Sequence, residues 1–171
     1  ISHGSLMGAR GNSGVILSQI MRGFASTMKS MTPGVDEKGR RFADALQAAS
    51  AGAYQAVLKP IEGTILTVVR ESAEAARARS DAGGSLLEVV RAARDAGKTA
   101  LDNTPEQLPV LKDAGVVDAG GAGFLLMLDS ALHVIGGEPL PEAEEDDGTG
   151  GAVAAAFDLI AKRSSTVEGE L

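Results

Sequence analysis

The sequence contains no cysteine and no tryptophan, and aromatic residues make up only 3% of its 171 residues. The absence of cysteine excludes disulfide bonds, thiolate metal sites and cysteine nucleophiles. It also fits a reducing compartment, and we expect the protein to be cytoplasmic. With so few aromatic residues, the core must be built from Ala, Leu, Val and Ile, and this composition favours closely packed helices.

Positive charge is also scarce, because 16 Lys and Arg residues face 23 Asp and Glu residues and leave a formal net charge of −7. An acidic chain of this kind is poorly suited to non-specific binding of nucleic acid or anionic lipid. No apolar run approaches the ~18 residues of a membrane-spanning helix, and no signal-peptide pattern opens the chain. We therefore expect neither nucleic-acid binding nor membrane insertion.

The length fits one domain with a short appendage. We expect a helical domain over residues 1–137, an acidic linker over residues 138–152, and a short helix and tail over residues 153–171 that lead toward a following domain. Because the chain begins with Ile1 and not with Met, we expect it to be part of a longer protein.

Every convincing hydrophobic period in the sequence is helical, and no stretch alternates apolar and polar residues long enough to predict a strand. Ser85 and Glu88 form the sequence pattern of a helix capping box, and residues 104–107 repeat it with a proline at the first helical position. These patterns predict an all-α fold. Apolar residues recur at helical spacing from Asn12–Ser13 to Phe24, over residues 42–57, over residues 65–76, from Ser85 onward, and over about residues 121–135.

A glycine-rich stretch, "GARGNSG" at residues 8–14, leads directly into an apolar helix. The N-terminus of such a helix offers unpaired N–H groups and the positive end of the helix dipole, and it therefore attracts anions. Asn12 and Ser13 add side-chain donors, while Gly11 and Gly14 allow a phosphate to approach the backbone. The patterns of a P-loop and of a Rossmann fingerprint are not met. The alternative is that Asn12 or Ser13 only caps the helix.

Two further stretches have the same design. "KPIEGTILTV" places Gly63 and Thr64 before an apolar helix, and "GVVDAGGAGFLLML" places Asp118, Gly120 and Gly121 before another. Three such helix N-termini could converge on one polyphosphate. The alternatives are simple N-capping by Thr64 and Asp118, and close helix packing at Gly120, Gly121 and Gly123.

These stretches, in this order and spacing, resemble the DhaL-like (Dak-type) ATP-binding domain, and in particular the amino-terminal domain of bacterial fatty acid kinases. The resemblance covers about residues 4–140. It implies a barrel or bundle of antiparallel amphipathic helices with a site for ATP or ADP at one rim. By the same resemblance, residues 11–14 would hold the phosphates, and Thr64 and the turn from Asp118 to Gly121 would border the rest of the nucleotide.

The resemblance also implies Mg²⁺, which this family binds with an Asp-rich loop of the DGDTG type. The chain contains no such loop, so we expect the metal ligands to lie upstream of it and place none within it. Glu62, Asp118 and Asp129 are too scattered in the sequence to form a chelating pair. No catalytic residue is assigned.

The implied function is phosphoryl transfer from ATP to a carrier-bound fatty acid, with a DegV-like fatty-acid-binding protein as partner. One alternative is the nucleotide subunit of a dihydroxyacetone kinase, and another is a non-catalytic helical module that binds nucleotide or lipid. Without the helices that flank the metal loop, the domain would expose apolar surface. We therefore expect some homo-oligomerisation, and because the Mg²⁺ ligands are missing we expect this piece to be inactive as a kinase by itself.

Overall fold

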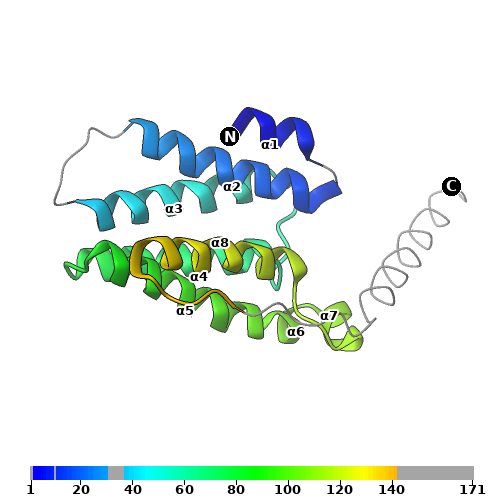
Figure 1. Cartoon of the computed structure of the whole chain (residues 1–171). Helices are drawn as coiled ribbons and strands as arrows, with labels where there is room; N and C mark the ends of the chain where they lie inside the picture. Colours follow the sequence, from blue (N-terminus) through cyan, green and yellow to red (C-terminus); the bar gives the residue numbers. More distant parts are fainter. Residues whose placement is uncertain (1, 10, 31–36, 142–171) are drawn as a thin grey trace, which may run out of the picture. The chain divides into compact units, whose positions relative to one another are not determined.

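The computed structural model describes residues 2–9, 11–30 and 37–141, and within them it contains α-helices and no strand (Figure 1). The predicted all-α fold is therefore confirmed for this part of the chain. The helices are α1 (Ser2–Gly8), α2 (Gly11–Ser30), α3 (Lys38–Gln55), α4 (Ile65–Asp81), α5 (Leu86–Asp102), α6 (Thr104–Gln107), α7 (Pro109–Ala114) and α8 (Ala119–Gly136).

The five long helices form a bundle in which consecutive members run in opposite directions (Figure 1). Helix α3 packs against α2 on one side and α4 on the other, α4 packs against α5, and α8 packs against both α4 and α5. With this alternation, the N-termini of α2, α4 and α8 lie at the same end of the bundle (Figure 1).

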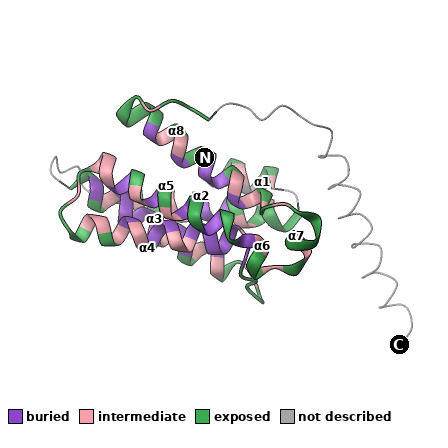
Figure 2. Ribbon diagram, turned by 90° about the horizontal axis from the view of Figure 1, so that it is seen from below, coloured by how far each residue is buried: buried purple, intermediate pink, exposed green. Residues whose placement is uncertain are grey.

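The core contains mainly small and branched aliphatic side chains, as the scarcity of aromatic residues predicts. Val68, Val69, Val89 and Val90 have no exposed surface, and alanines fill many of the remaining core positions. Buried residues are concentrated where α3, α4 and α5 face one another (Figure 2). Such small side chains let helix axes approach closely and keep the interior densely packed.

Helix α8 is long and apolar enough to cross a membrane by length and composition alone, with a mean hydropathy of 1.4 and 28% of that stretch buried. The sequence shows no uninterrupted apolar run of that length because Asp129 and His133 lie within this helix. Such a helix is weak evidence for a membrane span, because core helices of soluble proteins pass the same test. In this bundle, Phe124, Leu125 and Leu128 of α8 are buried against the other helices.

One predicted capping box is confirmed and the other is wrong. Ser85 caps α5: its side chain accepts a hydrogen bond from the Glu88 amide at 3.4 Å, and its own amide donates to the Glu88 carboxylate at 2.8 Å. Thr104 lies inside the four-residue helix α6, and its hydroxyl donates to the carbonyl of Leu101 at 2.7 Å. The hydroxyl oxygen of Thr104 accepts the distant amide of Asp118 at 3.1 Å, and the N-cap position of α6 belongs to Asn103, so Thr104 does not cap this helix.

Glu138, the first residue of the predicted acidic linker, contacts the helical bundle. Glu138 accepts hydrogen bonds from the side chains of Arg91 and Arg94 at 3.0 and 3.4 Å, so its carboxylate is tied to α5. The rest of the predicted linker from residue 142 onward, and the predicted short helix and tail, lie outside the described residues.

Candidate functional site

Three helix N-termini border one cleft of about 630 Å³. Helix α2 contributes Asn12 and Ser13, the start of α4 contributes Thr64, and Asp118 lies immediately before α8. The structure thus brings together four residues that the sequence singled out in three separate stretches. The wall of the cleft is completed by Val15, Ile16, Ala56, Val57, Leu58, Lys59, Ile61, Ile65 and Leu66.

At the first of these N-termini, the helix begins one or two residues earlier than the sequence indicates. Helix α2 starts at Gly11, so Asn12 and Ser13 lie within its first turn and neither occupies the N-cap position. Both side chains are exposed, and neither makes a hydrogen bond to any residue that the structure describes. The alternative in which one of them caps the helix is therefore wrong, and their polar groups are available to a ligand.

The two glycines of this loop have different surroundings. Gly11 has a positive φ of 63°, which a side chain rarely adopts, and a Cβ there would contact nothing within 4 Å. A Cβ at Gly14 would lie 3.3 Å from the Cα of Ala9, so this glycine allows α1 to pass close to the start of α2. Neither glycine is among the residues that line the cleft.

At the second N-terminus, Thr64 is the N-cap of α4. Its hydroxyl accepts a hydrogen bond from the amide of Leu66 at 3.3 Å and donates to the carbonyl of Ile61 at 2.8 Å. The capping role that the sequence left open is therefore present. Since Thr64 also lines the cleft, capping does not exclude a contact with a ligand.

At the third N-terminus, Asp118 caps α8 by accepting a hydrogen bond from the Gly121 amide at 2.7 Å. Burial raises the pKa of Asp118, and hydrogen bonds from the backbone amides of Gly121, Ile65 and Gly120 partly oppose this rise. Because Ile65 is the first residue of α4, the carboxyl group interacts with the N-termini of two helices at once. The capping alternative is present here too, and the carboxyl group still faces the cleft.

Two of the three glycines that follow Asp118, Gly120 and Gly121, serve helix packing. A Cβ at Gly123 would contact nothing within 4 Å, so the packing alternative is wrong there. A Cβ at Gly121 would lie 2.8 Å from Cγ2 of Val68, and one at Gly120 would lie 3.3 Å from Cβ of Ile65. Any larger residue would push the N-terminus of α8 away from α4. Neither glycine is among the residues lining the cleft, so the packing alternative accounts for their position.

Two features of the cleft were missed in the sequence. Lys59 is the only cation among the described residues that line it, and the segment from Ala56 to Ile61 supplies much of an apolar wall. The available signal was the dipeptide Lys59–Pro60, because a proline after a helix marks the point where the chain turns. What this turn faces depends on the packing of α2, which periodicity does not reveal.

The described residues do not form a site for Mg²⁺. They contain no group of three His, Asp, Glu or Cys side chains close enough to hold a metal ion. Asp118 is the only carboxylate among the described residues at the cleft, and one of its oxygens already accepts the Gly121 amide. Mg²⁺ requires several oxygen ligands in near-octahedral geometry, and the described residues at the cleft do not supply them.

Comparison with known families assigns most of the chain to one of them. The sequence model of the family described as "DAK2 domain" matches residues 1–133. The chain belongs to the DAK2 domain family. DAK2 domains occur in kinase systems and generally bind ADP or ATP.

The DAK2 chain is similar to bacterial proteins that are much longer. It is 44% identical over 142 residues to Protein YloV of Bacillus subtilis, covering 83% of this chain and 25% of that protein. It is 43% and 45% identical, each over 139 residues, to uncharacterized proteins of Staphylococcus saprophyticus and Staphylococcus epidermidis, in both cases covering 81% of this chain and 25% of the relative. The chain thus spans about a quarter of the length of these curated relatives.

Proposed function

We propose that this DAK2 domain binds ATP or ADP in the cleft where α2, α4 and α8 begin, and that it is the ATP-binding domain of a fatty acid kinase. The observation that carries the proposal is the convergence of three helix N-termini on one cleft. Each N-terminus presents backbone N–H groups and a partial positive charge, and together they match the charge of a polyphosphate.

The two halves of the cleft suit the two halves of a nucleotide. At the start of α2, the side chains of Asn12 and Ser13 make no hydrogen bond to a described residue, and we propose that they donate hydrogen bonds to phosphate oxygens. The apolar wall that includes Ile16, Val57 and Ile61 suits the flat face of the base. Lys59 would add positive charge at the edge of the cleft.

When the carboxyl group of Asp118 is ionised, its negative charge repels an anionic ligand. Its burial favours the protonated form, and a protonated carboxyl group would not repel a phosphate. Phosphoryl transfer depends mainly on positioning the nucleotide and neutralising charge on the transferred group. The described residues can position the nucleotide, and we propose that a further part of the protein supplies the ligands of Mg²⁺.

For the acceptor, we propose a fatty acid presented by a DegV-like carrier protein, which the enzyme would convert to an acyl phosphate. This finer proposal is supported by the resemblance of the three motifs to bacterial fatty acid kinases. The names of the relatives described above state no activity, and the experiment below tests the acceptor directly.

The experiment uses the protein at the length encoded by its natural gene. Calorimetric titration with ADP should show binding, and addition of ATP, Mg²⁺ and a fatty-acid-loaded DegV-like protein should produce ADP and acyl phosphate. Turnover of dihydroxyacetone without a carrier would instead favour the dihydroxyacetone kinase alternative. Nucleotide binding without turnover of either acceptor would indicate a non-catalytic module, and the absence of ADP binding would refute the nucleotide cleft itself.

A further inference from the structure

The turn before α4 is closely confined. Gly63 is buried and has a φ of 78°, and a Cβ at this position would lie 2.9 Å from Cβ of Gln107 and 3.0 Å from Cβ of Leu108. The next residue, Thr64, is the N-cap of α4 and lines the nucleotide cleft. The conformation at Gly63 therefore determines where Thr64 and the first amides of α4 lie.

A side chain supplies the hydrogen-bond partner of this turn. The amide of Gly63 donates to the hydroxyl oxygen of Thr67 at 2.9 Å, and that hydroxyl donates to Oε2 of Glu62 at 2.7 Å. Thr67 is only 1% exposed, so water does not readily replace either bond. The buried hydroxyl thus connects the two residues that precede Thr64 to the first turn of α4.

The acceptor of the Thr67 hydroxyl is itself held in place. Tyr54 donates to Oε1 of Glu62 at 2.8 Å, and Arg70 donates to Oε2 at 3.3 Å. Burial raises the pKa of Glu62, but hydrogen bonds from Thr67, Tyr54 and Arg70 outweigh burial, so the pKa lies below its ordinary value. The carboxylate therefore stays ionised at neutral pH and requires Thr67 to donate, which leaves the hydroxyl oxygen free to accept the Gly63 amide.

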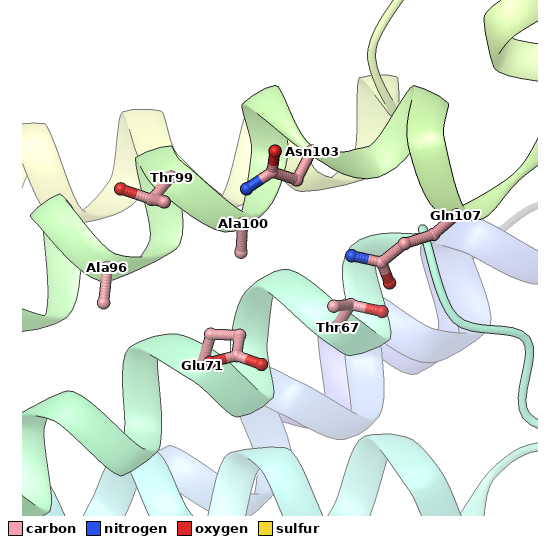
Figure 3. Close-up of a pocket in the computed structure, with 7 residues that line it drawn as sticks. All are labelled: Thr67, Glu71, Ala96, Thr99, Ala100, Asn103 and Gln107. Atoms are coloured by element: carbon pink, nitrogen blue, oxygen red, sulfur yellow. The ribbon is translucent and has the colours of Figure 1, made fainter.

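A second cleft of about 340 Å³ lies beside this cluster, between α4 and α5. Figure 3 shows Thr67 and Glu71 of α4 on one side, Thr99 and Asn103 on the other, and Gln107 reaching toward Thr67 from α6. Thr67 is one of the residues that line this second cleft, and its hydroxyl makes the two hydrogen bonds described above.

From these contacts we propose that Thr67 is a positioning residue of the nucleotide cleft. It holds Gly63 through its hydroxyl and thereby places Thr64 and the N-terminus of α4 against the phosphates of the bound nucleotide. Thr67 does not line the nucleotide cleft, so it acts through the turn and not by contact with the ligand. This inference rests on the proposed function, because it requires a nucleotide in that cleft.

The test compares Thr67→Val, Thr67→Ser and a matched control, Thr99→Val, in the protein of natural length. Valine has nearly the shape of threonine but leaves the Gly63 amide without its acceptor, whereas serine keeps the hydroxyl. The control removes a hydroxyl that borders the same second cleft and bonds only to the Asp95 carbonyl of its own helix, at 3.1 Å. Affinities for ADP and for adenosine are measured by calorimetry or by competition.

We expect Thr67→Val to weaken ADP binding about tenfold, equivalent to ~1.4 kcal/mol at 25 °C, and to change adenosine binding little. Thr67→Ser and Thr99→Val should bind ADP nearly as the natural protein does. The amide resonance of Gly63 should shift in the valine variant and return in the serine variant. A loss confined to the phosphate-bearing ligand and rescued by serine would not arise from lower overall stability.

Two results would overturn the inference without touching the proposed function. They are unchanged ADP affinity in Thr67→Val, and an equal loss for ADP and adenosine. If Thr67→Val does not fold, Tyr54→Phe serves instead, because it removes one donor to Glu62 from a half-buried position and should weaken ADP binding about twofold. Unchanged ADP affinity in that variant would likewise overturn the inference, whereas failure of the natural protein to bind ADP would refute the proposed function.

Discussion

Replacement of Gly63 by alanine should strongly destabilise the domain, for two separate reasons. The residue has a φ of 78°, a left-handed conformation that costs a residue with a side chain about 1–2 kcal/mol. The new methyl group would also lie 2.9 Å from Cβ of Gln107, 3.0 Å from Cβ of Leu108 and 3.0 Å from the carbonyl oxygen of Thr104. Contacts this short require the backbone or the neighbouring helix to move.

The magnitude follows from adding these terms. Overpacking of a well-packed region typically costs about 1–3 kcal/mol, while the loss of glycine flexibility in the unfolded chain returns about 0.4–1 kcal/mol. The expected net loss for Gly63→Ala is therefore about 2–4 kcal/mol. A typical domain has only about 5–15 kcal/mol of stability, so the loss should be large.

Two other glycines provide matched controls. Gly83 has a φ of 79°, but a Cβ there would contact nothing within 4 Å, so Gly83→Ala should cost only about 1 kcal/mol. Gly123 lies inside α8 with equally open space and no positive φ, so Gly123→Ala should stabilise the domain by about 0.5–1 kcal/mol. The difference between the first two variants isolates crowding from backbone strain.

The assay is urea denaturation followed by far-ultraviolet circular dichroism, with the free energy of unfolding extrapolated to water for each variant. Equal losses for Gly63→Ala and Gly83→Ala would refute the role of crowding. A stability loss for Gly123→Ala would contradict the open surroundings of that position.

Three further predictions concern side chains at or near helix N-termini. Asn12→Ala and Ser13→Ala should each weaken ADP binding, measured by calorimetry, by about 1.5–3 kcal/mol and should leave the melting temperature unchanged. Unchanged ADP affinity together with a lower melting temperature would indicate a structural role instead. The pKa of Asp118 is raised above its ordinary 3.8, so the carboxyl group loses its proton as pH rises through the range above that value. The negative charge that results repels the phosphates, and ADP affinity should therefore fall over this pH range. Asp118→Asn still allows capping and should lack this fall in calorimetric titrations. Hydrogen bonds from the backbone and side chain of Ser85, with help from Arg79, lower the pKa of Glu88 from 4.5 to about 2. The stability advantage over Glu88→Gln should therefore be complete above pH 4.5 and disappear as pH falls toward 2, as measured by urea denaturation; an advantage independent of pH would contradict it.

Local patterns in the sequence were sufficient for the helical fold and for several helix boundaries. Apolar residues at helical spacing are enough to predict α4 and α8, because one buried face per helix is a property of the segment itself. The Ser85–Glu88 capping box was equally predictable, since both partners lie within four residues of each other. The same reasoning failed at Thr104, whose hydroxyl bonds to the carbonyl of Leu101 and accepts the amide of Asp118 at 3.1 Å, 14 residues away.

The position and lining of the cleft depend more on tertiary packing than the helices themselves do. Local sequence identified Asn12, Ser13, Thr64 and Asp118 as residues at helix starts, and the resemblance to a family placed them around one nucleotide. Only the antiparallel packing of the bundle brings the three helix starts to one end and adds Lys59 and the apolar wall beside them. The distances from Gly120 and Gly121 to Ile65 and Val68 on α4, which show that both glycines serve close helix packing, also come from the tertiary structure alone. Helix formation depends on neighbours three or four residues apart, whereas a cleft between helices depends on side chains tens of residues apart that periodicity does not relate to one another.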